Sequence, residues 1–174
     1  GKTLVWVFGA GYLDENGNSA GNIRRLTGIG VDASDKAVRL TPVLTAADEW
    51  TRDVQPFQGI AELYHAMFQI KGMSSFVSFA QEFWVNDPEA KTLGTYRENG
   101  KTSMAVKKFP QWTSVYCAAP YSLTNRMIHR IAVNGGAFVC GKPGQSIFMN
   151  GNFISLHGIK PEKYEIALPP GKTK

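Results

Sequence analysis

The residues best suited to binding chemistry lie around Trp50, in the run Asp48-Glu49-Trp50. An exposed tryptophan ring can stack on the face of a sugar, and Asp48 lies beside it in the sequence. We therefore name Trp50 and Asp48 as the candidate sugar contacts. The alternative is that Trp50 packs in the core or at a subunit interface, and this role is the more common one for a tryptophan.

Two further patterns resemble ligand-binding motifs but lack residues that those motifs need. The glycines in 9–11 suggest a dinucleotide loop, yet the third glycine is replaced by Asp14 and the helix begins later. Asp14, Asn16 and Asn18 alternate as calcium ligands do, but Arg25 stands where a bidentate glutamate is required. A polar turn explains these residues better, and we predict no nucleotide and no metal cofactor.

The chain has two cysteines, Cys117 and Cys140. Two cysteines do not make a disulfide framework, and no Cys-x-x-Cys spacing indicates a metal site. We predict free, buried thiols that end two neighbouring strands. Cysteine usage leaves the cellular compartment open.

The composition is that of an ordinary globular protein. Hydrophobic residues make up 43% of the 174 and charged residues 19%, which excludes an intrinsically disordered chain. The formal net charge is +5, but no recognition motif for nucleic acid accompanies it, so a solvated basic surface is favoured. No apolar run is long enough to cross a bilayer. We predict neither a nucleic-acid partner nor a membrane partner.

The segment from Trp112 to Cys140 organises the predicted fold. Residues 113–117 are β-forming, and residues 137–140 form a second such run. Between them Ser122 is the expected N-cap of a helix, and glycines 135 and 136 are expected to end it. The apolar face of that helix comprises Leu123, Met127, Ile128 and Ile131. A strand, helix and strand of this length predict a right-handed crossover between parallel strands.

The N-terminal run Leu4–Phe8 is apolar throughout and predicts a strand buried on both faces, as in parallel sheets. Such a strand cannot remain at an open edge without inviting pairing. After it, Ser19 is expected to begin a short helix that ends at Gly28.

Antiparallel pairs are expected elsewhere in the chain. Asn99-Gly100 predicts a hairpin between residues 93–97 and 103–108, and Asn150-Gly151 predicts another between 145–149 and 152–157. A last strand is expected over 164–168. The chain thus reads as α/β in two places, with antiparallel hairpins between and after them.

Four segments, taken in order, carry a resemblance to a known family. They are Val5-Trp-Val-Phe-Gly-Ala-Gly-Tyr-Leu13 with Asn22 and Leu26-Thr-Gly-Ile29; Asp87-Pro88 with Leu93-Gly94-x-Tyr96 and Gly100-Lys101; Trp112-Thr-Ser-Val-Tyr116 with Ala119-Pro120; and Asn150-Gly-Asn-Phe-Ile-x-Leu156-His157. Together they resemble the amidotransferase-like domain that follows the TIM barrel in large β-galactosidases, often called the β-galactosidase trimerisation domain, and the small β segment after it. The match covers most of 2–168 and is weakest over 45–75.

The resemblance implies a fold class and a domain organisation. The fold would be α/β, with a flavodoxin-like or class I amidotransferase-like parallel sheet, complete or incomplete, antiparallel hairpins and a C-terminal β segment. Residues 1–144 would form the amidotransferase-like domain with a β-rich insertion at about 30–110, and residues 145–174 the small β segment. The family usually has strands and helices before the equivalent of Leu4, so the chain reads as a C-terminal portion of a longer protein or as a reduced variant.

The function implied is that of a non-catalytic accessory or assembly domain of a carbohydrate-active hydrolase. Catalysis in such glycoside hydrolases belongs to two glutamates of the barrel, so no catalytic carboxylate is carried over to this chain. The expected partners are a second or third copy of the chain, with part of 45–75 in the contact, or an upstream catalytic barrel. A secreted or periplasmic location is slightly favoured.

Two alternatives remain open. Amidotransferase-like folds can carry a Cys-His-Glu triad, which here implies a freestanding hydrolase with Cys117 as nucleophile, His157 as base and Glu162 or Glu165 to orient it. Against this, Cys117 lacks the glycine neighbours that form a strained elbow, and a small apolar cysteine at the end of a strand is the plainer interpretation. The second alternative is a sugar-binding module.

Overall fold

The computed structural model describes residues 1–38, 40–45, 48–52, 54, 80–119, 123–143, 145–150, 153–158 and 163–171. Its main sheet contains β1 (Lys2–Val7), β4 (Val31–Val38), β5 (Pro42–Leu44), β6 (Ala80–Val85), β7 (Lys91–Tyr96), β8 (Thr102–Lys108) and β9 (Trp112–Cys117). Two small hairpins are formed by β2 (Leu13–Asp14) with β3 (Gly17–Asn18) and by β10 (Ser146–Asn150) with β11 (Phe153–His157). The helices in these ranges are α1 (Ala20–Thr27) and α3 (Asn125–Asn134).

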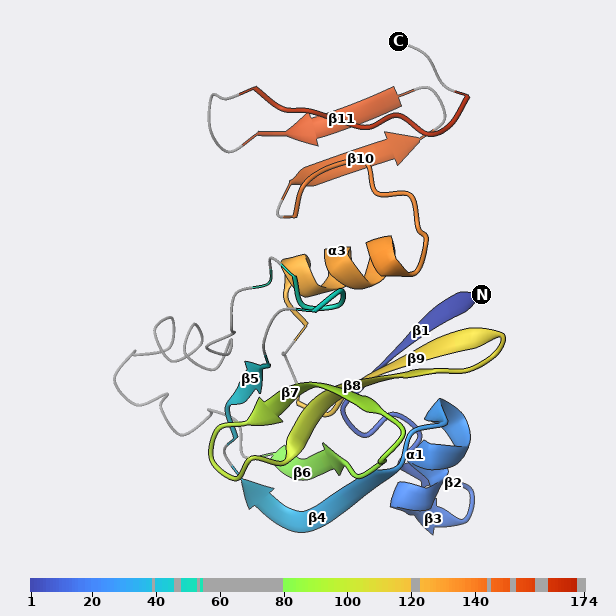
Figure 1. Cartoon of the computed structure of the whole chain (residues 1–174), viewed down its shortest axis with the longest axis vertical. Helices are drawn as coiled ribbons and strands as arrows, with labels where there is room; N and C mark the ends of the chain where they lie inside the picture. Colours follow the sequence, from blue (N-terminus) through green and yellow to red (C-terminus); the bar gives the residue numbers. More distant parts are fainter. Residues whose placement is uncertain are drawn as a thin grey trace.

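The main sheet is mixed and mostly antiparallel. Its order is β1-β9-β8-β6-β4, with β7 beside β8 and β5 beside β7. β1 and β9 pair in parallel, whereas the other ladders of the sheet are antiparallel. Figure 1 shows that the sheet is strongly curved and lies below α3. The described chain is therefore largely β, with two helices.

The predicted parallel partner of β9 was wrong. Residues 137–140 form no strand, and the parallel neighbour of β9 is β1, in the register from Lys2 opposite Trp112 to Val7 opposite Cys117. The physical reason is that β9 is paired on both sides, by β1 and β8, so no edge is left for a strand after α3. The chain continues from α3 into the β10–β11 hairpin instead (Figure 1).

The two helices pack on opposite faces of the central strands. On one face Val115 and Cys117 of β9 join Met127 and Ile131 of α3 in a buried cluster. On the other face the alternate residue of β9, Tyr116, joins a cluster that contains Ile23 of α1. Each apolar side chain buried in this way contributes roughly 1.5–3 kcal/mol before ordering entropy is subtracted.

The helix ends agree in part with the sequence prediction. α1 begins after Ser19, whose hydroxyl accepts from the backbone N–H of Gly21 at 3.1 Å, and it ends at Gly28 as expected. α3 begins later than expected: Thr124 is its N-cap and accepts from the N–H of Met127 at 3.1 Å. The predicted cap, Ser122, lies outside the described residues.

The expected burial of the N-terminal strand was also wrong. β1 is an edge strand, and Leu4, Val5 and Val7 are 40%, 40% and 42% exposed. Trp6 is the β1 side chain that packs against the core cluster on the α1 face. A strand with apolar side chains on both faces thus lies where one of its long edges has no described neighbour.

Both predicted hairpins are confirmed, but the last predicted strand is not. β7 pairs with β8 and β10 pairs with β11, each in antiparallel order around the expected turns. Residues 164–168 are not part of any strand in the structure. Instead the N–H of Ala167 donates to the carbonyl of Cys140 at 2.8 Å, which ties the C-terminal segment to the chain that leads into β10.

Two left-handed glycines allow the packing of the Phe109 ring against Gly28, at the end of α1, to be tested. Gly28 and Gly100 have φ of 73° and 70°, but a Cβ on Gly28 would meet the Phe109 ring at 2.4 Å, whereas Gly100 faces open space. Alanine at either position costs about 1–2 kcal/mol for the backbone conformation. We expect Gly28→Ala to lower the free energy of unfolding by about 1–3 kcal/mol more than Gly100→Ala, because the ring has to move. Equal losses in urea denaturation would contradict the close contact.

Candidate functional site

Cys117, the candidate nucleophile, is sealed inside the fold. It is the last residue of β9, its side chain is 0% exposed, and it lies in the cluster beneath α3. Its Sγ donates to the carbonyl of Ala119 at 3.7 Å. A nucleophilic thiol has to reach solvent and a substrate carbonyl, and Cys117 is packed as a small core residue instead.

The other members of the suggested triad lie elsewhere. His157 ends β11 and is exposed, and the β10–β11 hairpin stands on the far side of α3 from the main sheet (Figure 1). Glu165 is also exposed, and Glu162 lies outside the described residues. The structure therefore does not bring Cys117 and His157 together, since α3 covers the thiol and the histidine belongs to a separate hairpin.

Trp50, the candidate sugar contact, is 3% exposed. Its ring belongs to the buried cluster that also contains Leu93 and Met104, and its Nε1–H donates to Glu49 at 3.0 Å. Neither face of the ring is presented to a ligand, so this placement gives the predicted sugar contact no support. The alternative weighed from the sequence, a packing role, fits the position of the ring.

Asp48 builds the turn that holds Trp50 in place. Its Oδ1 accepts from the backbone N–H of Trp50 at 2.6 Å and of Thr51 at 3.0 Å, and its Oδ2 pairs with Lys91 of β7 at 2.7 Å. Burial alone raises the pKa of Asp48, but the contacts with Lys91 and the two N–H groups outweigh it and hold that pKa below its ordinary value. The carboxylate is therefore ionised and occupied by its own chain.

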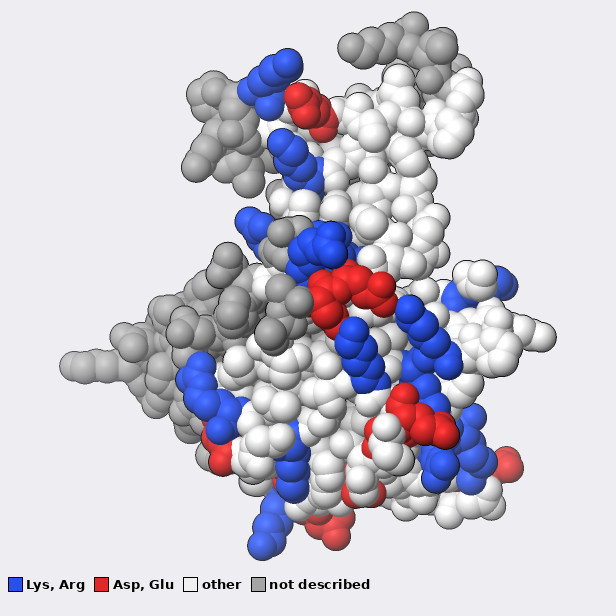
Figure 2. Space-filling view, viewed as in Figure 1, with Lys and Arg blue, Asp and Glu red and all other residues white. Residues whose placement is uncertain are grey.

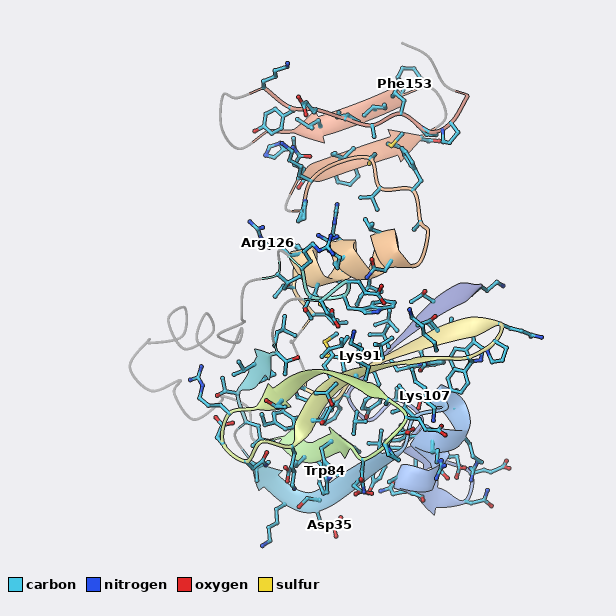
Figure 3. The ribbon with its side chains drawn as sticks, viewed as in Figure 1. Asp35, Trp84, Lys91, Lys107, Arg126 and Phe153 are labelled. Carbon is cyan, nitrogen blue, oxygen red and sulfur yellow. The ribbon has the colours of Figure 1, made fainter. Side chains whose placement is uncertain are left out.

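Other carboxylates in the described part of the chain are likewise used for structure. Asp87 accepts from the N–H of Gly30 and from Lys107, both at 2.9 Å, and Lys107 also pairs with Glu89. Burial raises the pKa of Asp87, yet these bonds outweigh it and lower the pKa overall. Figure 3 shows Lys107 close to α1, where it links β8 to the loop after β6.

Within the described residues, no group of three His, Cys, Asp or Glu side chains could hold a metal ion. In the same part of the chain, no helix is long and apolar enough to span a membrane. Figure 2 shows lysines and arginines interleaved with acidic side chains on the face that it displays, and the upper right of that face carries almost no charge. The features that stand out are therefore apolar surfaces rather than a charged site.

The first apolar surface is the outer edge of β1. β1 is followed directly by Phe8, whose φ of 56° is the sole positive value at a non-glycine position in the described chain. Phe8 is fixed there because its N–H donates to Cys117 at 2.8 Å, its carbonyl accepts from Tyr116 Oη at 2.5 Å, and its ring packs edge-on against Phe83. A left-handed phenylalanine costs of order 1–3 kcal/mol, so these contacts must hold β1 firmly against β9.

The second apolar surface is the β10–β11 hairpin. Phe148 is 69% and Phe153 83% exposed, and Met149 and Ile154 are also exposed. The Asn150-Gly151 turn predicted this hairpin, but the exposure of its two phenylalanines was not predicted. Residues two positions apart in a strand lie on the same face. Phe148 therefore shares a face with Asn150 in β10, and Phe153 shares a face with Ser155 in β11. This pairing of each phenylalanine with a polar residue was the available signal.

Comparisons with protein-family models, with curated proteins and with solved structures give no match for this chain. The amidotransferase-like family and the glycoside-hydrolase function thus gain no support from known proteins, and both stay predictions.

Thiol reactivity separates a buried cysteine from a nucleophile. In the Cys140→Ser variant, which leaves Cys117, we expect labelling by a thiol reagent to be slow in the native state and fast in denaturant, because the thiol is fully covered. In the Cys117→Ser variant the half-buried Cys140 serves as the matched control and should react faster. Rapid native-state labelling of Cys117 that persists at acidic pH would instead support an activated thiolate.

Proposed function

We propose that this chain is a non-catalytic assembly domain of a carbohydrate-active hydrolase of the β-galactosidase type. The order of the family-like segments supports the parent class, and the sealed Cys117 supports the absence of catalysis by a thiol. The observation that carries the proposal is the exposed apolar edge strand β1. Edge strands of this kind are commonly protected by charge, by a bulge or by a covering segment.

The finer fold assignment belongs to the same proposal. A parallel pair, β1 and β9, has α1 on one face and α3 on the other, which is the local arrangement of an amidotransferase-like or flavodoxin-like sheet. The antiparallel strands from β4 to β8 then correspond to the β-rich insertion, and β10–β11 to the small C-terminal segment. This division keeps the boundaries that the resemblance implies.

The backbone of β1 has one side turned to β9 and one side turned outward. Because the N–H of Phe8 donates to Cys117, alternation along the strand directs the amides of Leu4 and Trp6 toward β9 as well. The amides and carbonyls of Thr3, Val5 and Val7 then point away from β9. Among the described strands β9 is the only neighbour of β1, so these groups form an edge ready to accept another strand.

A second copy of the chain is the partner that this edge fits. In antiparallel pairing about a two-fold axis, Val5 lies opposite Val5 of the second copy, and Thr3 lies opposite Val7. All three outward-facing residues are then in hydrogen-bonded positions. The charged residue of the strand, Lys2, lies opposite Phe8 rather than another lysine, so no like charges meet. The exposed side chains of Leu4, Val5 and Val7 would be buried against their counterparts.

Sedimentation velocity at micromolar concentration tests this assembly. We expect the unmodified chain to form a dimer, and Val5→Lys or Val7→Lys to weaken the dimer by at least about tenfold in Kd, because a charged edge opposes pairing. Both valines are exposed, so the variants should fold. Leu13→Lys is the matched control, since Leu13 is 71% exposed on β2, and it should leave the dimer intact.

A chain that stays monomeric at high concentration, or a dimer that the two valine variants leave unchanged, would rule out pairing through β1. In the first case a catalytic domain becomes the better candidate for the covering partner. In the second case the contact lies on another surface of the chain.

A further inference from the structure

The β10–β11 hairpin has two chemically different faces. Its register places Phe148 opposite Ser155 and Asn150 opposite Phe153, so these side chains project from one side of the ribbon. We call this side the outer face; its residues are Ser146, Phe148, Asn150, Phe153, Ser155 and His157. The opposite side, the inner face, is aliphatic and consists of Ile147, Met149, Ile154 and Leu156.

The inner face is partly covered by the chain itself. Ile147 and Leu156 are half-buried, and Ile147 packs so closely on Gly141 that a Cβ there would meet its Cδ1 at 2.2 Å. The hydrogen bond from Ala167 to Cys140 keeps the C-terminal segment beside the entry to the hairpin. The hairpin is therefore anchored to the rest of the chain through its aliphatic side.

The outer face, by contrast, is open at every position. All six residues are exposed, and the two phenylalanine rings are among the most exposed large apolar side chains in the described chain. Figure 3 places Phe153 at the end of the molecule away from the main sheet, where a long ligand can approach without touching β1 or α1. Exposing two aromatic rings beside each other is costly in water, so this face is expected to have a ligand.

The chemistry of the outer face points to an uncharged ligand with both apolar and hydroxyl surfaces. Phe148 and Phe153 are diagonal neighbours across the ladder, near enough to contact adjoining units of one extended ligand. Around the rings the polar groups are two hydroxyls, one amide and one imidazole, with no Asp, Glu, Lys or Arg among them. A nucleic acid or an acidic peptide would require cations here, and an aliphatic protein surface would leave these polar groups unpaired.

We propose that the outer face of the hairpin binds a neutral polysaccharide chain. The C–H groups of a pyranose face carry a small positive charge and stack on the negative faces of Phe148 and Phe153. The ring hydroxyls exchange hydrogen bonds with Asn150, Ser155 and His157 at the rim. The inference rests on the proposed role in a carbohydrate-active hydrolase, and it assigns polysaccharide capture to a surface distinct from the β1 edge.

Affinity electrophoresis tests the proposal with the full chain. The native gels contain a soluble linear galactan or a soluble xylan, and polygalacturonate serves as an anionic control polymer. We expect retardation by at least one of the neutral polymers, and a loss of about tenfold or more in apparent affinity for the Phe148→Ala/Phe153→Ala variant. Both rings are exposed, so removing them should not unfold the chain. Phe148→Tyr/Phe153→Tyr keeps the ring faces and should keep the retardation.

Three outcomes would overturn the proposal: no retardation by either neutral polymer, retardation only by polygalacturonate, or retardation that the double alanine variant leaves unchanged. Sedimentation of the same variants separates this inference from the assembly role. The phenylalanine variants should remain dimeric, and Val5→Lys should become monomeric while a single copy still binds the polymer. Loss of binding in the phenylalanine variants through general unfolding would show as lost far-UV dichroism, and the tyrosine variant then decides the result.

Discussion

The parallel ladder between β1 and β9 is the interaction on which the rest of the structure depends. It occupies one side of β9 while β8 occupies the other, so β9 becomes the centre of the sheet. That position buries Val115 and Cys117 beneath α3 on one face of the sheet. It buries Tyr116 on the opposite face, in the cluster that contains Ile23 of α1. The same ladder leaves the outer side of β1 without a described neighbour, and an apolar strand in that position is open to pairing with a further strand.

The ladder also explains why the thiol of Cys117 is inaccessible to solvent. Cys117 lies at the carboxyl end of β9, where a nucleophile is often found in α/β enzymes, but its side chain is fully buried. Carboxylates that lie near the core are held by lysines and backbone N–H groups: Asp48 by Lys91 and Asp87 by Lys107. Within the described residues, the β1 edge and the outer face of β10–β11 both present exposed apolar side chains.

Local signals in the sequence were reliable where short-range interactions decide the structure. Asn99-Gly100 set the β7–β8 hairpin, and Ser19 with Gly28 set the ends of α1, because a turn or a cap depends on residues only a few positions apart. Pairing between distant segments was not predictable in the same way. Residues 137–140 have strand propensity, but β9 had no free side for them, and the partner it uses comes from the other end of the chain.

The candidate site followed the same rule. Trp50 and Asp48 were adjacent in sequence and plausible as a sugar contact, yet the turn around Asp48 and the cluster beneath α3 cover the tryptophan. That burial depends on Leu93 and Met104, which are far away in the sequence. The exposed pair Phe148 and Phe153 could have been found from alternation within one hairpin, since both faces are encoded locally.

Hydrogen exchange at single amides of β1 tests the central claim most directly. The amides of Leu4 and Trp6, which point toward β9, should exchange slowly at every protein concentration. The amides of Val5 and Val7 point outward, so they should exchange rapidly in dilute solution and become protected as the concentration rises. Equally fast exchange of Val5 and Val7 at all concentrations would contradict pairing through this edge, and fast exchange of Leu4 and Trp6 would contradict the β1–β9 ladder itself.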